Sequence, residues 1–548
     1  MSARGRPQGL HLRPVCFSRQ QQRRLLNHFI SKAPEQTGQP IPFRFTLAVK
    51  DNIATTTATV NSSPTSASSD PPQPTPALPT TCASHFLSTY RSPFEATIVS
   101  QLRARGARLV GKTNLDEFGM GSHSTHSAFG AVSQPQSQSD PPGNNLLQLS
   151  AGGSSGGSAV AVATGEADVA LGTDTGGSVR LPAAYCGVVG FKPSYGMLSR
   201  YGVVPYANSL DTVGLLASGV GRIRELIVGG GGGGQGGEGH GLWEEWDARD
   251  PTSLSVAARR RCARRREGYS PQEKERGVLK RVKFGIPLEY NIEELDPRIR
   301  DAWAKAAKTL QDEFGARVVP VSLPSTRHAL SAYYVIAPAE ASSNLAKYDG
   351  IRYGTRDTDS GSDATGGVLY AASRGKGFGE EVKRRILLGS YTLSSKAMDN
   401  YFIQAQRVRR LVRRDFNRVF ALDNPLHERE TFDLTDLDES IVMEDKWGPE
   451  EVDFLLCPTA PTLAPRLEDI MNQTPVDAYM NDVFTVPASL AGLPAISIPV
   501  PLSETATDDA EKSRTAGLQL IGQYWDDARL LAVAEAVLQT LRSTTSTR

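Results

Sequence analysis

Short apolar runs alternate with amphipathic stretches along much of the chain. The run at 45–49 (FTLAV) is typical of a strand. The stretch 298–314 places Ala302, Ala306 and Leu310 on one side of a helix, with Gly315 just beyond its end. The same pattern predicts further strands at 107–110, 168–172 and 318–321, and further helices at 94–105 and 158–163. Strands that alternate with helices predict an α/β fold whose sheet is mainly parallel.

Three segments of a different composition interrupt this pattern. Residues 57–79 and 132–145 are rich in Ser, Thr, Pro and Gln, and 229–241 consist almost entirely of Gly. Such compositions cannot supply a core. The entropy of closing a loop grows slowly with its length, so a domain tolerates insertions of this kind. We therefore predict a single domain over 35–540, with insertions at 57–79, 132–145 and 229–270.

A basic tract follows the Gly segment. Residues 259–283 carry eleven Lys and Arg side chains against three Glu. One interpretation is contact with RNA phosphates. The other is a solvated charged loop, and it is favoured because the tract lacks a series of aromatic side chains on which bases stack.

Composition excludes several classes of protein. The chain has 548 residues with 60 basic and 59 acidic side chains, so its net charge of +1 gives no overall attraction to nucleic acid or anionic lipid. Its five cysteines contain no C-x-x-C pair, which argues against a disulfide framework or a zinc cluster and favours a reducing compartment. No apolar run approaches the roughly 18 residues that a membrane helix needs, so no membrane insertion is expected.

The first 34 residues are rich in Arg and contain no acidic residue before Glu35. This composition is typical of an organellar transit segment, with cleavage expected before Leu25. The other interpretation is an ordinary basic helix, because Leu26, Phe29 and Ile30 also fit a packing stripe.

Two short motif matches are rejected because the residues around them do not fit the structure that each motif requires. Residues 106–113 fit the phosphate-loop pattern G-x-x-x-x-G-K-[ST], but a predicted helix precedes them and the run ARLV is a better strand than a phosphate cradle. Residues 153–157 fit the nucleophile-elbow pattern G-x-S-x-G, but no strong strand precedes them. The downstream histidines also have no evident acidic partner; they are His240, His328 and His427.

Two longer Gly/Ser loops carry the candidate chemistry. They read AGGSSGGS at 151–158 and GTDTGGSVR at 172–180, and they flank a segment with the pattern of a packed helix and strand. Repeated glycine allows the backbone to approach a reacting atom closely. The N–H groups of Thr175, Gly176, Gly177 and Ser178 are candidates for an oxyanion hole.

A nucleophilic serine needs a base, and a buried lysine can replace histidine. Lys50 ends the predicted strand 45–49, a position where α/β folds collect their sites. Taken alone, however, Lys50 would be interpreted as a surface charge.

Taken together, five segments resemble the amidase signature family: LAVKDNI (47–53), GKTNLDEFGMGS (111–122), AGGSSGGSA (151–159), GTDTGGSVRLPAAYCGVVGFKPSYG (172–196) and SRYGVVPYANSLDTVG (199–214). The resemblance implies a central mixed β-sheet covered by helices on both faces. It implies that Ser178 is the nucleophile, that Ser154 is a cis-configured serine which relays a proton, and that Lys50 is the base. Ser155 would support the loop, and no metal is expected.

Downstream segments are similar to the glutaminase subunits of glutamyl-tRNA(Gln) amidotransferases of the mitochondrial type. They are 83–99, 331–354, 379–395 and 481–499. This resemblance implies hydrolysis of glutamine, bound by Tyr333, Arg385 and Asp482. The ammonia would pass to a B-type subunit that holds Glu-tRNA(Gln) and uses ATP and Mg²⁺, so no cofactor is expected in this chain. The resemblance also implies a small third subunit. The N-terminal composition and the insertions predict a location in the mitochondrial matrix.

The resemblance covers roughly residues 41–535 apart from the insertions, and it fails over 229–283. Two other functions stay open at this stage, namely a stand-alone amidase for small molecules and a non-catalytic assembly subunit. From the residues alone, Arg385 also fits a surface ion pair, and Asp482 also fits the cap of a helix or turn.

Overall fold

The computed structural model describes residues 26–34, 43–56, 77–135, 148–229, 240–266, 279–357, 368–428, 450–502 and 515–546. Most of the predicted N-terminal and low-complexity segments lie outside these ranges, at 1–25, 57–76, 136–147 and 230–239. The transit segment and the insertions therefore stay predictions. The basic tract is described only up to 266 and from 279 onward.

One eleven-stranded sheet runs through the described part of the chain, in the order β1-β3-β2-β4-β6-β5-β10-β11-β9-β7-β8. Its strands are β1 (Phe29–Lys32), β2 (Phe45–Lys50), β3 (Ala107–Thr113), β4 (Val169–Asp174), β5 (Val189–Lys192), β6 (Thr212–Ala217), β7 (Lys283–Pro287), β8 (Arg317–Val321), β9 (Phe454–Pro458), β10 (Ala495–Pro501) and β11 (Thr515–Gly522).

The sheet is mixed, as the resemblance implied, and the expectation of a mainly parallel sheet was wrong. Only β2 with β3 and β4, and β7 with β8 and β9, pair in parallel. The centre of the sheet, from β4 to β9, is antiparallel throughout. Among the described residues, no α-helix separates β5 from β6, so these two strands are free to pair antiparallel. The helix–strand alternation of the N-terminal part does not extend to them.

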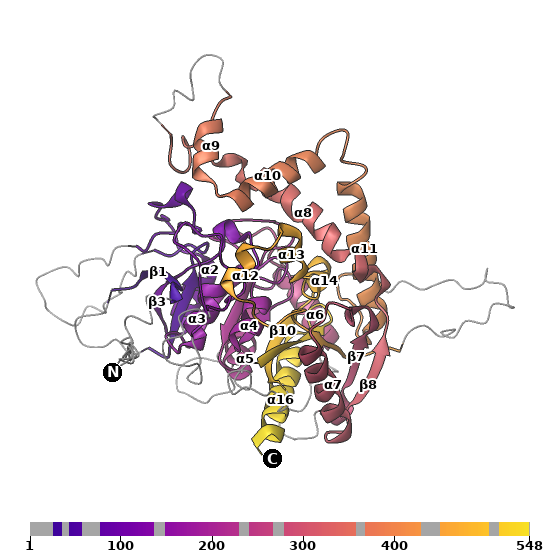
Figure 1. Ribbon diagram of the computed structural model, residues 1–548. Coiled ribbons are helices and arrows are strands. Elements are labelled where there is room, and N and C mark those ends of the chain that lie inside the picture. Colours follow the sequence, from indigo (N-terminus) through magenta and orange to yellow (C-terminus); the bar gives the residue numbers. More distant parts are fainter. Residues whose placement is uncertain are drawn as a thin grey trace, which may run out of the picture.

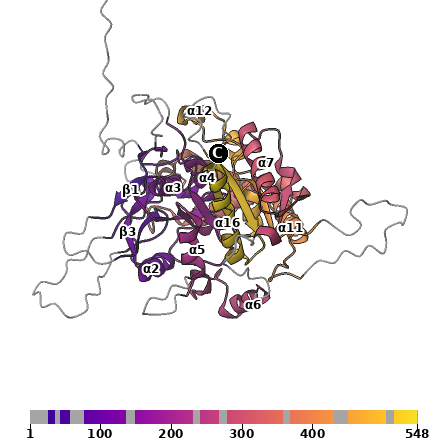
Figure 2. The same cartoon turned by 90° about the horizontal axis from the view of Figure 1, so that it is seen from below.

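Helices cover both faces of this sheet. They are α2 (Thr97–Ala104), α3 (Gly156–Ala163), α4 (Arg180–Cys186), α5 (Val220–Val228), α6 (Val256–Arg266), α7 (Pro297–Asp312), α8 (Ala329–Asn344), α9 (Ala371–Gly377), α10 (Glu380–Thr392), α11 (Phe402–Val419), α12 (Leu467–Met471), α13 (Pro475–Met480), α14 (Val486–Ala491) and α16 (Asp527–Ser546). Figure 1 shows α8, α10 and α11 along one side of the molecule, with α7 and α16 at the opposite side. Seen from below in Figure 2, α16 lies over the strands next to α5.

Alternating residues of the strands supply the two cores. In β2, Leu47 and Val49 belong to the large core on one face, whereas Ala48 belongs to a second core on the other. Val169 and Ala170 of β4 divide in the same way. This two-residue period is what a strand buried on both faces requires.

Most predicted elements are confirmed to within a few residues. Helix α7 begins where Asp296 accepts a hydrogen bond from the Arg298 N–H, with Pro297 in the first turn. Strand β3 runs through Gly111 and Lys112, so the phosphate-loop match is part of a strand. Lys112 is fully buried there and pairs with Asp51 at 3.0 Å.

The basic tract differs from its prediction over 256–266. This segment forms α6 and packs against the domain, with Cys262 buried and Arg259 only 3% exposed. Arg259 is satisfied because it donates to carbonyl oxygens of Trp243, Leu254, Gly196 and Met197 at 2.6–3.2 Å. Composition could not separate this one structural arginine from its exposed neighbours. Within the described residues, no helix is long and apolar enough to cross a membrane.

Candidate active site

The two Gly/Ser loops and the end of β2 meet at one edge of the sheet. Lys50 is the last residue of β2, Ser154 and Ser155 precede α3, and Ser178 lies in the turn between β4 and α4. Since β2 and β4 are parallel neighbours, their carboxyl ends lie side by side. The Ser155 N–H donates to the Ser178 carbonyl oxygen at 3.1 Å, which joins the two loops directly. The Gly153–Ser154 peptide bond is cis, the configuration that the resemblance implied for this serine.

Lys50 is fully buried among hydroxyl groups. Its Nζ lies 2.7 Å from Ser154 Oγ, 2.7 Å from Ser155 Oγ and 3.0 Å from Thr173 Oγ1. Lys50 makes no ion pair with any described residue, in contrast to the equally buried Lys112. Burial lowers the pKa of Lys50 to about 7, even though Asp116, Asp174 and Asp211 act from a distance to raise it. A large fraction of Lys50 is therefore neutral near pH 7 and able to accept a proton.

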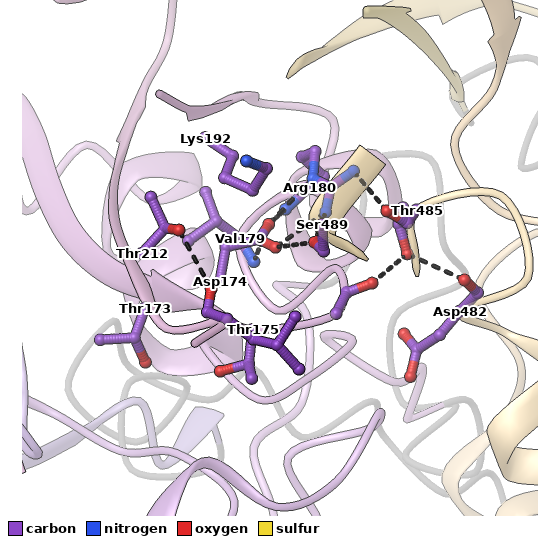
Figure 3. A network of polar contacts seen from close by, with 12 residues as sticks. Thr173, Asp174, Thr175, Val179, Arg180, Lys192, Thr212, Asp482, Thr485 and Ser489 are labelled. Carbon is purple, nitrogen blue, oxygen red and sulfur yellow. Dashed lines mark hydrogen bonds and ion pairs between the residues drawn. The ribbon is translucent and has the colours of Figure 1, made fainter. Parts of the chain in front are cut away.

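Ser178 is partly exposed, whereas Ser154 is only 1% exposed and Ser155 is fully buried. The turn that carries Ser178 is held by a buried ion pair between Asp174 and Arg180 (Figure 3). Arg180 donates to both carboxylate oxygens of Asp174, at 2.8 and 3.0 Å. Burial alone would raise the pKa of Asp174, but Arg180 outweighs it and the net pKa lies below the usual value.

Arg180 also connects this turn to α14 and β11. It donates to Ser489 Oγ at 2.8 Å, to the Thr485 carbonyl oxygen at 2.9 Å and to Gln519 Oε1 at 2.6 Å (Figure 3). The planar guanidinium thus fixes the backbone on both sides of Ser178. This anchoring is the preorganisation that a nucleophile requires.

The predicted oxyanion loop has donors available. The N–H groups of Gly176, Gly177 and Ser178 donate no hydrogen bond to any described residue. The Thr175 hydroxyl is engaged, because it donates to Asp211 Oδ1 at 2.8 Å. Unpaired N–H groups next to a serine are what an oxyanion needs, and the roles of these four residues stay predictions.

The glycines of this loop are required by close contacts. A Cβ on Gly176 would lie 2.6 Å from Cζ of Tyr333, and a Cβ on Gly177 would overlap Thr485. A Cβ on Gly177 would also lie 3.2 Å from Asp482 Oδ1. Two of the predicted glutamine-binding residues therefore lie against the nucleophile loop.

Arg385 is the third, and it is 3% exposed within a cage of tyrosines. Its Nη1 donates to Tyr206 Oη at 2.6 Å and its Nε to Glu381 Oε1 at 2.8 Å. The guanidinium also lies within 5.7 Å of the ring centres of Tyr206, Tyr334 and Tyr479. The surface ion pair considered from the sequence is therefore wrong, because the Arg385 side chain points into the domain.

Asp482 is buried next to this cage. Its Oδ2 accepts from Ser122 Oγ at 3.0 Å and from Tyr334 Oη at 3.1 Å. Burial raises the pKa of Asp482 to about 7, because no cation is close enough to offset the loss of water fully. A cavity of about 400 Å³ opens here, and its lining includes Ser122, Glu381, Arg385 and Tyr479. The arrangement offers a cation for a carboxylate and a carboxylate for an ammonium group, and Asp482 lies against the loop that carries Ser178.

Several residues of this site were not identified from the sequence. Asp174 and Arg180 stand inside the GTDTGGSVR loop, and two opposite charges in an otherwise uncharged stretch were a signal for their pairing. Tyr206 and Asp211 stand in the segment 199–214 that carried part of the resemblance, yet nothing local shows what they contact. Their roles depend on the folding of distant segments onto β4.

Comparison with known proteins agrees with this geometry. The model of the family described as Amidase matches residues 74–531. The chain is 65% identical to the A-type subunit of the mitochondrial glutamyl-tRNA(Gln) amidotransferase of Podospora anserina and 64% identical to its counterpart from Neurospora crassa. These matches cover 99% of this chain and 100% and 99% of the relatives.

A solved structure agrees as well. The A-type subunit of the glutamyl-tRNA(Gln) amidotransferase of Thermotoga maritima is 31% identical, with a TM-score of 0.64 over 95% of this chain and 92% of that one. The site contains a buried lysine beside two serines and a glycine loop with available N–H groups. This geometry and the matches to known proteins point to the same family. The chain belongs to the amidase family.

Proposed function

We propose that this chain is the glutamine-hydrolysing subunit of a mitochondrial glutamyl-tRNA(Gln) amidotransferase. The relatives that match it over their full length carry the name of that enzyme. The observation that carries the proposal is a cavity lined by Arg385, next to the buried Asp482 that lies against the loop of Ser178. A neutral apolar amide would leave the buried Asp482 carboxylate without a cation, at a cost in free energy, and it would bring Arg385 no anion besides Glu381, with which it already pairs. The α-carboxylate and α-ammonium groups of glutamine satisfy both.

The first half of the proposed reaction forms an acyl-enzyme. Ser178 Oγ attacks the side-chain amide carbon of glutamine while Ser154 takes the Ser178 proton. Ser154 passes its own proton to neutral Lys50 across the 2.7 Å contact. The negative charge on the amide oxygen is stabilised by the N–H groups of the 175–178 loop.

The second half releases ammonia and restores the enzyme. Ser154 donates a proton to the leaving nitrogen and regains one from Lys50, so ammonia departs and a γ-glutamyl ester remains on Ser178. Water then attacks the ester carbonyl and gives its proton to the same relay. Glutamate leaves with Ser178 in its starting state, and no redox step or metal ion is required.

The acceptor reaction belongs to other subunits in this proposal. A B-type subunit holds Glu-tRNA(Gln) and activates its glutamyl group with ATP and Mg²⁺, and this chain supplies the ammonia without a cofactor of its own. A small third subunit completes the complex. The complex is placed in mitochondria because the relatives are mitochondrial, and in the matrix because that compartment holds the tRNA.

The test is ammonia release from glutamine by the purified chain, alone and with a B-type partner, compared with Ser178→Ala. Release that needs Ser178 and rises with partner and charged tRNA supports the proposal. Release from simple amides but not from glutamine would make the chain a stand-alone amidase. No release even in the complex would make it a non-catalytic assembly subunit.

A further inference from the structure

A short helical turn, Glu117–Gly119, lies between Ser154 and α10. On one side, the N–H of Asp116 donates to the Ser154 carbonyl oxygen at 3.2 Å. A Cβ on Gly119 would lie 3.6 Å from Ser154 Oγ. On the other side, Glu117 Oε2 accepts from the N–H of Gly379 at 2.8 Å. Gly379 is the N-cap residue of α10, immediately before Glu380. This turn therefore joins the serine relay to the helix that carries Arg385.

The Glu117 carboxylate is buried, with 6% of the residue exposed, and both of its oxygens are engaged. Oε1 accepts from Ser84 Oγ and Oε2 from Gly379. Glu117 makes no ion pair with any described residue, since Lys383, the nearest cation that acts on it, pairs with Glu380. Burial raises the pKa of Glu117 to about 7. Burying a carboxylate without a counter-ion costs free energy of folding, which suggests that Glu117 serves a specific role at this position.

Glu117 and Gly379 are in close contact. A Cβ on Gly379 would overlap Glu117 Oε2, so the carboxylate is in direct contact with the backbone. Phe378, which precedes Gly379, stacks on Phe86 at 4.8 Å between ring centres. The first N–H groups of a helix have no partner within the helix, and a negative charge at that end also interacts favourably with the helix dipole. The start of α10 is thus fixed by Glu117.

Because Glu117 fixes the start of α10, it also affects the position of the α10 side chains that line the cavity. Glu381 and Arg385 lie on its buried side, one turn apart, and are joined at 2.8 Å. Arg385 follows Gly379 by six residues, about 9 Å along a helix. A shift at the start of α10 therefore moves Arg385 by a similar amount, because a helix translates as a unit.

We propose that Glu117 is a positioning residue for substrate binding: its carboxylate holds the start of α10 and so sets the distance between Arg385 and the reacting Ser178. This proposal rests on the role given to Arg385 above. The Glu117 side chain does not belong to the lining of the cavity, and its two hydrogen bonds come from Ser84 and Gly379 and not from Ser154 or Ser178. Its effect therefore falls on the binding of glutamine and not on the proton relay.

Three variants test this role in the full amidotransferase complex at pH 8. Glu117→Ala removes both hydrogen bonds. Glu117→Gln keeps both, because the amide oxygen accepts from Gly379 and the amide nitrogen donates to the Ser84 hydroxyl, but it removes the charge. Glu380→Gln is the control. Glu380 is the first residue of α10, next to Gly379, and its side chain is 83% exposed.

The KM for glutamine is expected to rise about 10-fold in Glu117→Ala and about 3-fold in Glu117→Gln, with kcat within about 2-fold of the wild type. Glu380→Gln is expected to match the wild type in both. Equal KM values in all variants, or a fall in kcat as large as the rise in KM, would overturn the positioning role.

If Glu117→Ala fails to fold, Ser84→Ala tests the positioning role in its place. It frees one carboxylate oxygen and keeps α10 and the charge, and it also removes the bonds of the Ser84 hydroxyl with the Phe86 N–H and the Gly377 carbonyl oxygen. The KM of Ser84→Ala is expected to rise about 2-fold to 5-fold. An unchanged KM in a folded Ser84→Ala would count against the proposal. Failure of the proposed function has a different signature, because the wild-type complex itself would then release no ammonia from glutamine.

Discussion

Lys50 Nζ lies 2.7 Å from Ser154 Oγ, and the two residues come from positions 104 apart in the chain. Lys50 is fully buried and Ser154 is 1% exposed. A proton can pass between these two atoms without a bridging water. The direction in which it passes depends on whether the lysine is charged.

The rate of glutamine hydrolysis is expected to rise with pH around neutrality. Burial lowers the pKa of Lys50 to about 7, so the ammonium form predominates below that pH and the amine above it. Only the amine accepts the proton from Ser154. The kcat of the purified complex is therefore expected to increase by about tenfold for each unit well below the apparent pKa and to level off above about pH 8. A kcat independent of pH from 6 to 9 would contradict a neutral lysine base.

Substitutions of Lys50 separate its basicity from its bulk. Lys50→Met and Lys50→Arg are both expected to lower kcat by about 10²–10⁴-fold, because neither side chain accepts a proton at neutral pH. Lys192→Met is the matched control. Lys192 is also buried with a pKa lowered to about 7, but it donates to the Pro193 carbonyl oxygen and not to a serine. Its kcat is expected to stay within a few-fold of the wild type if the variant folds.

The KM for glutamine is expected to fall as the pH rises through about 7. Asp482 is protonated below its raised pKa, and the neutral acid attracts the α-ammonium group weakly. Asp482→Asn keeps the shape and removes the charge, so KM is expected to rise about 10-fold to 100-fold. Steady-state assays from pH 6 to 8 show both effects.

A substrate analogue checks the assignment of Asp482. Glutaramate has the same amide and carboxylate as glutamine but no α-ammonium group. The wild type is expected to prefer glutamine strongly, and Asp482→Asn is expected to lose most of that preference. A variant that still prefers glutamine as strongly would show that another group binds the ammonium.

Breaking the buried ion pair behind Ser178 is expected to destabilise the fold. Arg180→Ala leaves Asp174 buried without its cation, which typically costs about 3–5 kcal/mol. Ser489→Ala removes one hydrogen bond to the same guanidinium and is expected to cost about 1 kcal/mol. Chemical denaturation measures both. Equal losses in the two variants would show that the pair is not the main support of the loop.

Arg259 is a structural arginine of the basic tract, and its removal is expected to be measurable. Arg259→Ala deletes hydrogen bonds to four backbone carbonyls and leaves them buried, with an expected loss of about 2–4 kcal/mol. Arg260→Ala, at the exposed neighbouring position, is expected to change stability by less than about 0.5 kcal/mol. If the two variants have the same melting temperature, α6 does not pack as described.

Local sequence was enough for the helices and strands near the catalytic loops. The strand at 45–49 and the helix at 158–163 were predicted from apolar patterning and glycine placement, and the structure contains them as Phe45–Lys50 and Gly156–Ala163. The direction of the central strands was not predictable, because antiparallel pairing of β5, β6, β10 and β11 depends on which segments meet in space. Composition likewise could not show that Arg259 is buried while Arg260 is exposed.

The sequence by itself determined the chemical groups: two serines in glycine loops, a lysine at the end of a strand, and a candidate cation and carboxylate for the ends of glutamine. Only the tertiary structure decided their state. Lys50 and Asp482 have shifted pKa values because the packed domain removes water from them and brings no partner close enough to offset the loss. Arg385 and Glu117 become a buried anion–helix–cation arrangement only because the fold brings the start of α10 to Glu117 and Arg385 to Tyr206. Burial and distance between remote segments are properties of the fold, and no local pattern of residues contains them.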